Sequence, residues 1–448
     1  MDFDEYSFAD LLSNIVDNRG KTCPVEDKGF PLIATNCIKD DSLYPVFEKV
    51  RFVSDDTYKN WFRGHPNAGD IIFVCKGSPG RVAWVKEPVS FCIAQDMVAI
   101  RADQRLVDPM FLFSLLRSEQ VINKINNMHV GTLIPHFKKG DFKNLYLSIP
   151  RNLKIQRAIG LFYFSLSEKI EKNKEINQTL EQMAQALFKS WFVNFEPVKA
   201  KMAVLEAGGS QEDATLAAMT AISGKNADAL AVFEREHPEQ YAELKATAEL
   251  FPSAMQDSEL GNIPVTWELG KLQDLLVLQR GFDLPSSARK DGEFPLIAAS
   301  GPNGTHNVAM AKAPGVITGR SGVLGKVYLT LEDYWPLNTT LWVKEFKRAT
   351  PCYAYELLRL LDMKAFNAGS AVPSLNRNHI HSLSYPLPPM ALVNLFESSA
   401  LLLHQRAHVN LKHSQSLALL RDTLLPKLLS GEITLPEAEL AVSEAENV

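Results

Sequence analysis

The sequence has no long hydrophobic run and few cysteines, and its first residues are not basic. No uninterrupted apolar stretch among its 448 residues approaches the roughly 18–20 residues that a membrane helix needs. The five cysteines are odd in number and contain no C-x-x-C pair, which disfavours a disulfide framework and a cysteine-rich zinc site. The first five residues are acidic where a signal peptide would be basic. We therefore expect a cytoplasmic protein with reduced thiols and no membrane partner.

The sequence also lacks the common catalytic motifs. The segment 322–327 has neither the spacing nor the final hydroxyl of a phosphate-binding P-loop, and no H-E-x-x-H metal motif occurs. We find no Asn-Pro-Pro-aromatic or Asp-Pro-Pro-Tyr tetrapeptide of the kind that amino-methyltransferases use on a flipped base. We therefore expect no catalytic residue, metal ion or cofactor on this chain. One alternative stays open, because Asp333, Glu345 and Lys347 could imitate the carboxylate and lysine cluster of a metal-dependent nuclease.

Charge is distributed unevenly along the chain. Hydrophobic residues make up 46% and charged residues 22%, which is ordinary for a soluble globular protein. The net charge is −5, but residues 431–448 hold five acids and no Lys or Arg, and residues 203–260 hold eleven acids against three bases. The rest of the chain therefore carries +8. A surplus of this size permits contact with a polyanion but does not require it.

The chain contains an internal repeat, which implies two copies of one domain. The motif Gly131-Thr-Leu-Ile-Pro135 recurs 238 residues later as Gly369-Ser-Ala-Val-Pro373, and the same offset relates Leu145 to Leu383. Earlier matches keep the same order: 77–82 with 322–327, 30–34 with 294–298, and 19–20 with 280–281. The loops between the matches differ in length, so we expect similar frames with different surfaces. We predict an α/β tandem repeat of two globular domains.

A long helical segment follows each copy. Apolar residues recur in steps of three and four, as in a coiled-coil seam, with Asn173 in the middle of the first stripe. We predict the following seam positions: Ile159, Leu166, Asn173, Leu180, Leu187, Leu402, Val409, Leu417 and Leu424. Pro426 should kink or end the second helix. We expect the two helices to pair as an antiparallel coiled coil that separates the two domains; the alternative is that each helix packs on its own domain.

These features divide the chain into six parts. We predict a first domain at 1–150, a long helix at 151–202, an acidic helical connector at 203–260, a second domain at 261–389, a second long helix at 390–430, and an acidic tail at 431–448. The connector could pack on the long helices or on a partner protein. The tail could be disordered or could mimic phosphate.

Several motifs together resemble one known family. The segments 169–192 and 420–431 are similar to the helix signatures of the specificity subunit of type I restriction-modification systems. The two Gly-x-x-x-Pro motifs that close the repeats, at Gly131 and Gly369, are similar to that family too. The resemblance covers nearly the whole chain. It implies two target-recognition domains, each followed by a long helix.

The resemblance also implies a function. It implies a DNA-reading subunit without an active site, which recognises a bipartite, asymmetric target in double-stranded DNA with one half-site for each domain. The expected partners are methyltransferase subunits and, for cleavage, restriction subunits; S-adenosylmethionine and ATP are expected on those partners, not on this chain. Two alternatives remain, a protein scaffold that does not bind DNA and, less favoured, the metal-dependent nuclease.

The candidate DNA-binding residues are polar residues of the matched loops. Forked or amide side chains read base edges, while Lys, Arg, Ser and Thr anchor phosphates. In the first domain we select Arg19, Lys21, Lys76, Arg81, Thr132, His136, Lys138 and Lys139. In the second domain we select Arg280, Arg320, Lys326, Ser370, Ser374, Asn376 and Arg377. For each of these the alternative is a solvated polar residue or a turn former.

Overall fold

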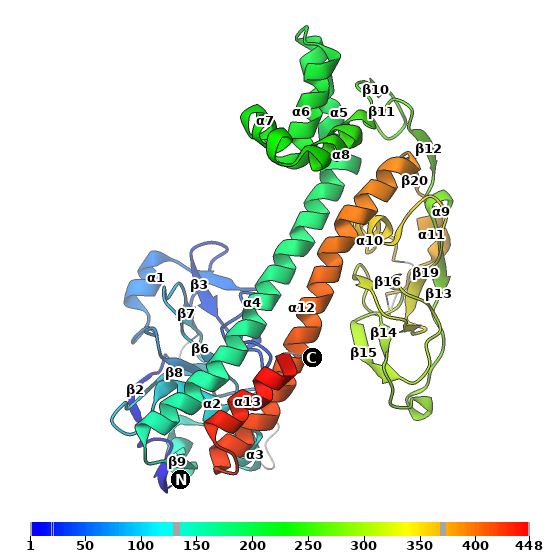
Figure 1. Cartoon of the computed structure of the whole chain (residues 1–448). Coiled ribbons are helices and arrows are strands. Elements are labelled where there is room, and N and C mark those ends of the chain that lie inside the picture. Colours follow the sequence, from blue (N-terminus) through cyan, green and yellow to red (C-terminus); the bar gives the residue numbers. More distant parts are fainter. Residues whose placement is uncertain (1, 19, 21, 129–134, 368–372, 447–448) are drawn as a thin grey trace. The chain divides into compact units, whose positions relative to one another are not determined.

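The computed structural model describes residues 2–18, 20, 22–128, 135–367 and 373–446 (Figure 1). The chain forms two units, one of Met1–Ile176 with Asn410–Val448 and the other of Asn177–Val409. Both long helices contribute one part to each unit. Within these described ranges, every helix is either too short or too polar to cross a bilayer.

The first unit contains a domain of two small sheets and one outer strand pair. Its four-stranded sheet has the order β2 (Leu12–Val16), β8 (Met97–Ala102), β5 (Ile71–Val74), β6 (Val82–Trp84). Its three-stranded sheet has the order β4 (Arg51–Val53), β3 (Phe30–Ile33), β7 (Cys92–Ile93), and β1 (Phe3–Ser7) pairs with β9 (Tyr146–Pro150). All pairs are antiparallel except β3 with β7. The helical elements are η1 (Thr35–Cys37), α1 (Asp55–Asn60), α2 (Pro109–Leu116), α3 (Glu119–Asn127) and η2 (Lys139–Asn144).

The second unit repeats this topology strand for strand. Its sheets have the orders β13 (Leu276–Arg280), β19 (Thr340–Phe346), β16 (Gly315–Gly319), β17 (Val327–Thr330) and β15 (Gly301–His306), β14 (Phe294–Ala298), β18 (Trp335–Pro336). The outer pair is β12 (Glu268–Lys271) with β20 (Ser384–Leu387), and a short pair joins β10 (Met255–Gln256) and β11 (Ile263–Pro264). The parallel pair recurs as β14 with β18. Its helical elements are α9 (Leu272–Leu275), η3 (Ser286–Ala288), α10 (Pro351–Leu360) and α11 (Arg377–His381). The predicted tandem repeat is confirmed.

Each domain has a central strand that is buried on both faces. In β5 every residue is buried, and Ile71 and Phe73 point to one hydrophobic cluster while Ile72 and Val74 point to another. This alternation follows from the two-residue period of a strand. A continuous apolar run in the sequence therefore becomes the middle of the domain, and the polar residues lie in the loops at its ends.

The two long helices, α4 (Leu153–Phe192) and α12 (Met390–Ser430), run antiparallel (Figure 1). In the first unit, Arg421 donates to the hydroxyl of Ser167 at 3.2 Å, and Asn173 donates to the hydroxyl of Ser414 at 3.1 Å. In the second unit, Asn177 donates to the carbonyl oxygen of Ala407 at 3.0 Å. Residues with higher numbers along α4 therefore contact residues with lower numbers along α12. The predicted antiparallel coiled coil is confirmed.

The predicted seam positions differ in burial between the two helices. Ile159, Leu166, Leu417 and Leu424 are buried, and Asn173, Leu180 and Leu187 are half-buried. However, Leu402 and Val409 are 67% and 56% exposed, so these two seam predictions are wrong.

The error is one of helical phase. Steps of seven back from Leu424 and Leu417 lead to Asn410 and Leu403, and Asn410 is only 6% exposed. A shift of one residue turns a side chain by about 100° around a helix, which moves Leu402 and Val409 out of the seam. The predicted apolar stripe therefore leaves out the buried Asn410 and includes the exposed Leu402 and Val409 instead.

One predicted helix end differs from the structure. The first long helix ends at Phe192, not at residue 202, because Phe195 adopts a left-handed conformation with φ of 54° and Pro197 lies in the first turn of a new helix, α5 (Glu196–Glu206). Pro426 does not end the second helix, which continues to Ser430. The loss of one backbone hydrogen bond near the end is offset by burial of Leu425 and Leu428.

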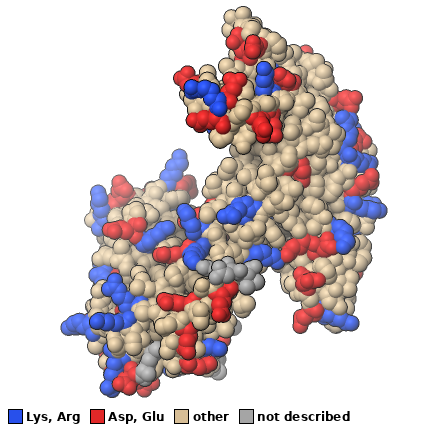
Figure 2. Space-filling view, viewed as in Figure 1, with Lys and Arg blue, Asp and Glu red and all other residues tan. Residues whose placement is uncertain are grey.

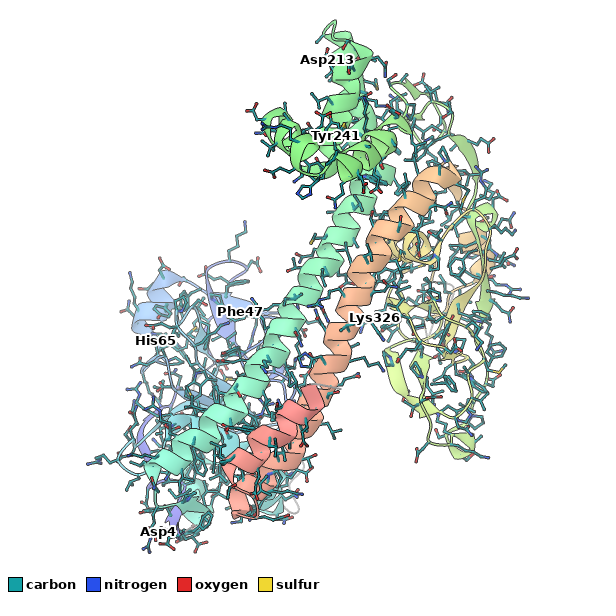
Figure 3. The ribbon with its side chains drawn as sticks, viewed as in Figure 1. Asp4, Phe47, His65, Asp213, Tyr241 and Lys326 are labelled. Carbon is teal, nitrogen blue, oxygen red and sulfur yellow. The ribbon has the colours of Figure 1, made fainter. Side chains whose placement is uncertain are left out.

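The connector is a small helical module. It contains α6 (Gln211–Ser223), α7 (Ala227–Glu236) and α8 (Pro238–Glu249), and Ala218, Met219, Leu230 and Ala248 form its own buried cluster. Figure 3 shows Asp213 on α6 and Tyr241 on α8. Acidic side chains dominate its surface (Figure 2), as the sequence composition requires.

The acidic tail is mostly helical. Residues Leu435–Glu446 form α13, and Ala438 and Val442 are buried in the core of the first unit. The alternative that this tail is disordered is therefore wrong for the residues of α13. The two buried apolar side chains anchor this amphipathic helix, and the acidic side chains of α13 lie on its other side.

Candidate nucleic-acid interface

In the first domain, the β5–β6 hairpin is tied to the segment that follows Pro135. The amide of Gly77 donates to the carbonyl oxygen of Pro135 at 3.1 Å, and the amide of Phe137 donates to that of Cys75 at 2.8 Å. Lys76 and His136 form a β-bridge between these two bonds. Gly77 has φ of 85°, which favours glycine at this turn. Two candidate residues that lie 60 positions apart in the sequence thus become neighbours.

A polar cleft of about 510 Å³ opens beside this bridge. It is lined by Asp17, Gly20, Thr22, Cys75, Lys76, Gln95, Asp96 and His136. Sequence reasoning selected Lys76 and His136 but missed Asp17, Thr22, Gln95 and Asp96. Acidic residues are not among the candidates because phosphate contacts need donors or positive charge. In addition, only the pairing of β5 with β8 brings Asp96 next to Lys76.

The second domain builds the same frame. The amide of Gly322 donates to the carbonyl oxygen of Pro373 at 2.9 Å, and the amide of Leu375 donates to that of Arg320 at 2.8 Å. Ser321 and Ser374 form the corresponding bridge. The candidates Arg320 and Ser374 are therefore brought together.

The backbone contacts define a position-by-position correspondence between the two domains. Cys75 corresponds to Arg320, Lys76 to Ser321 and His136 to Ser374, because equivalent atoms make equivalent hydrogen bonds. The two frames are alike, but the side chains at these three positions differ in charge and size.

The remaining candidates have varied surroundings. Arg81 forms an ion pair with Asp40 at 2.9 Å, and Arg280 forms one with Asp283 at 3.2 Å. The side chain of Asn376 accepts a hydrogen bond from the amide of Asn378 at the start of α11. Arg377 lies in α11, Lys138 and Lys139 lie at the start of η2, and Lys326 lies in the β16–β17 hairpin (Figure 3). Arg19, Lys21, Thr132 and Ser370, like most of both Gly-x-x-x-Pro motifs, lie outside the described residues.

The possible nuclease cluster has a different arrangement. Asp333 accepts hydrogen bonds from the Lys312 ammonium at 2.5 Å and the Ala313 amide at 3.0 Å, and the bond to Lys312 is the main cause that lowers its pKa. Glu345 pairs with Val277 in the β13–β19 ladder. In the part of the chain that the structure describes, no three His, Cys, Asp or Glu residues are grouped to hold a metal ion. Asp333 fixes the chain before β18.

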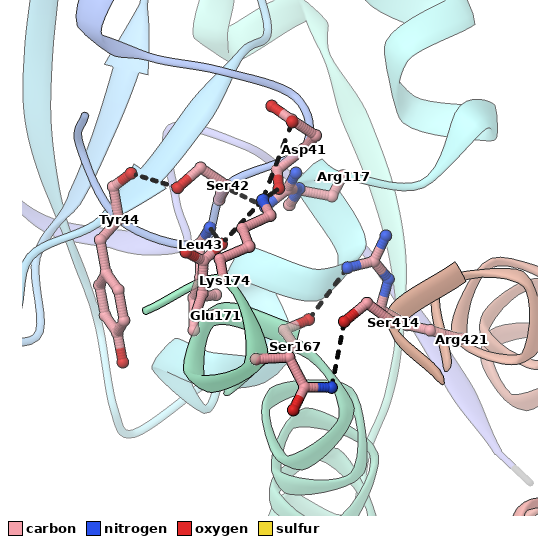
Figure 4. Close-up of polar contacts among 11 residues, drawn as sticks. Asp41, Ser42, Leu43, Tyr44, Arg117, Ser167, Glu171, Lys174, Ser414 and Arg421 are labelled. Carbon is pink, nitrogen blue, oxygen red and sulfur yellow. Dashed lines mark hydrogen bonds and ion pairs between the residues drawn. The ribbon is translucent and has the colours of Figure 1, made fainter. Parts of the chain in front are cut away.

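Polar contacts attach the first domain to the long helices within the first unit (Figure 4). The amide of Leu43 donates to the carboxylate of Glu171 at 3.0 Å, and the ammonium group of Lys174 donates to the carbonyl oxygen of Asp41. Burial is the main cause that raises the pKa of Tyr44 to about 12, and the nearby carboxylate of Glu168 adds to it. The hydroxyl of Tyr44 therefore stays protonated. These contacts hold the domain in one orientation on α4.

These features define a class of two-domain proteins in which one α/β domain occurs twice and each copy precedes a helix of 40 or 41 residues. Residues 23–182 match the family model described as the type I restriction modification DNA specificity domain. The chain is similar to type I restriction-modification specificity subunits, as its helix segments and repeat motifs predicted.

Three proteins illustrate the similarity. The HindI specificity subunit of Haemophilus influenzae is 29% identical over 403 residues, which is 82% of this chain and 86% of that protein. The MjaIX specificity subunit of Methanocaldococcus jannaschii is 23% identical over 380 residues, with coverage of 82% and 78%. The crystal structure of the type I restriction-modification S subunit from M. genitalium has a TM-score of 0.55 at 15% identity and 96% coverage of both chains. This last likeness shows a shared fold.

Proposed function

We propose that this chain reads a bipartite, asymmetric target in double-stranded DNA, with one half-site for each domain. The observation that carries the proposal is the correspondence of the two loop frames. Equivalent bridges place Lys76 and His136 in one domain where the other has Ser321 and Ser374. Arg320 lies beside the second pair, at the position that the fully buried Cys75 has in the first domain. Because base edges are distinguished by donor and acceptor pattern, different side chains on one frame favour different half-sites.

The cations of the same loops would anchor the DNA backbone. In the first domain Lys76 lies beside the cleft, and Lys138 and Lys139 follow the bridge directly. In the second domain Lys326 and Arg377 take this role. Phosphate contacts fix the position of a protein on the duplex and make binding weaker at high salt.

The chain would supply recognition, and its partners would supply catalysis. We propose that methyltransferase subunits dock on it and that restriction subunits join for cleavage, with S-adenosylmethionine and ATP bound by those partners. Support comes from α12, where Leu402 and Val409 lie seven residues apart on one face and are both largely exposed. Exposed apolar stripes of this kind mark surfaces that another protein covers.

Co-expression with the neighbouring methyltransferase subunit tests the proposal. The pair is produced in a bacterium that lacks the system, and modification-sensitive sequencing of the host genome follows, with each subunit alone as the control. A split motif that is methylated only when both are present is the expected result. A complex that co-purifies but yields no motif would overturn the proposal in favour of a scaffold that does not read DNA.

A further inference from the structure

The cleft of the first domain contains two adjacent polar side chains, Gln95 and Asp96, to which the proposed function assigns no role. Both are half-buried, and both line the cleft with Lys76 and His136. They lie in the short link between β7 and β8, which places them at the end of the central sheet. A role for them in DNA reading rests on the proposed function, because it requires the cleft to face DNA.

The backbone of Asp96 is held firmly in place. Its carbonyl oxygen accepts from the amide of Cys75 at 2.9 Å and from the amide of Lys76 at 3.3 Å. A side chain that projects from a backbone fixed in this way reaches a narrow range of positions, as base discrimination requires. The loop therefore positions the carboxylate rather than leaving it free to move.

The carboxylate of Asp96 is available for a ligand. Within the described residues, neither Gln95 nor Asp96 makes a side-chain hydrogen bond or ion pair. Asp17, the other carboxylate of the cleft, already has an interaction partner in the structure. Asp96 is thus the acid of this cleft that the fold itself does not use.

A carboxylate beside DNA can recognise only some bases. It repels phosphate, and in the major groove it can accept a hydrogen bond from the N4 amino group of cytosine or the N6 amino group of adenine. Guanine and thymine present the acceptor atoms O6 and O4 there, which a carboxylate repels. Lys76 on the neighbouring bridge would counter the repulsion from adjacent phosphates.

We propose that Asp96, with Gln95 beside it, reads the exocyclic amino group of an adenine or a cytosine in the first half-site. It excludes guanine and thymine at that base position. Asp96 is therefore a specificity-determining residue of this domain.

The second domain provides an internal comparison. Thr339 occupies the equivalent position, because its carbonyl oxygen accepts from the amides of Arg320 at 2.8 Å and Ser321 at 3.0 Å. Its hydroxyl accepts a hydrogen bond from the amide of Ala299 at 3.2 Å, so this side chain is engaged in the fold. The proposed recognition of adenine or cytosine by a carboxylate therefore applies to the first half-site alone.

The test uses the complex of the full chain with its methyltransferase subunit and the variant Asp96→Asn. The amide is nearly the same size as the carboxylate, and its NH₂ group can donate to guanine O6 or thymine O4. In genome-wide modification sequencing, the wild type should restrict one position of the first half-site to A or C. Asp96→Asn should lower that discrimination by about tenfold or more, as the loss of one good base contact would. The second half-site should stay unchanged.

Two controls make the result decisive. Glu234→Gln removes the same charge from the exposed surface of α7 and should leave the motif unchanged. Fluorescence anisotropy with duplexes that carry each base at the restricted position measures the same discrimination even if methylation is slow. A split motif that Asp96→Asn leaves intact, or relaxes in both halves alike, would overturn this inference alone. The absence of any split motif from the wild type would overturn the proposed function with it.

Discussion

The side-chain amide of Asn173 on α4 donates a hydrogen bond to the hydroxyl of Ser414 on α12 at 3.1 Å. A longer bond of 3.4 Å joins the same amide to the carbonyl oxygen of Asn410, which is itself buried in the seam. A polar layer of this kind sets the register of two helices, because any slip would leave buried polar groups without partners. The seam of the first unit therefore specifies one alignment.

Replacement of Asn173 should weaken this layer. Asn173→Ala should lower the free energy of unfolding of the protein by about 1 kcal/mol, the usual contribution of a hydrogen bond of this kind. Urea denaturation followed by circular dichroism measures the change. Lys172→Ala, one residue away on the exposed side of α4, is the control and should change stability by less than about 0.5 kcal/mol. Equal effects of the two variants would contradict a register role for Asn173.

Gly160 is a glycine inside α4 that the fold requires. A Cβ atom there would lie 2.6 Å from the amide nitrogen of Phe111 and 2.8 Å from the carbonyl carbon of Met110, so α2 crosses α4 at this residue. Alanine normally stabilises a helix relative to glycine by about 1 kcal/mol, but the backbone clash outweighs that gain.

Gly160→Ala should therefore destabilise the first unit, by about 2 kcal/mol, in the same denaturation experiment. Gly140→Ala is the matched control, since nothing lies within 4 Å of its added Cβ. A stabilised Gly160→Ala protein would show that α2 does not press on this residue.

The second unit contains a buried ionisable cluster with an expected pH response. Glu356 is 1% exposed, and burial raises its pKa to about 7 despite the neighbouring Arg359. His404 is half-buried, and desolvation lowers its pKa to about 4. A raised carboxyl pKa stabilises the fold at low pH, and this stability is lost as the pH rises from about 4.5 to about 7. The lowered histidine pKa has the opposite effect, with stability lost as the pH falls from about 6.5 towards 4.

The two effects oppose each other where the ranges overlap, between about pH 4.5 and 6.5, so the thermal stability of the wild type should change little there and fall as the pH rises towards 7. Glu356→Gln keeps the shape but cannot ionise, so it should raise Tm at pH 8 relative to wild type and flatten the decline between pH 5 and pH 8. Differential scanning calorimetry of both proteins across this range measures the effect. An identical pH profile for wild type and variant would mean that Glu356 does not ionise in the folded protein over this range.

The sequence predicts topology better than it predicts sites. Matched anchors such as Gly77 with Gly322 reveal the repeat because the same turn needs the same positive φ in both copies. The partner of a loop residue depends on strand pairing, however, so nothing near Asp96 in the sequence indicates that it lies beside Lys76. The helix end at Phe192 escapes prediction for a similar reason, since a left-handed Phe195 has no sequence signature.

The wrong seam prediction has its own consequence. Leu402 and Val409 form an exposed apolar face of α12, and burial of such a face by a partner would contribute about 25 cal/mol for each Å² of apolar surface covered. The double variant Leu402→Glu, Val409→Glu should therefore lose co-purification with the methyltransferase subunit, because a buried unpaired carboxylate costs several kcal/mol. Since both side chains point to solvent in the isolated chain, its own Tm should change little. Gln415→Glu adds a carboxylate at an exposed position on another face of the same helix and should keep the complex intact. Size-exclusion chromatography with light scattering distinguishes the outcomes, and an intact complex with the double variant would place the docking surface elsewhere.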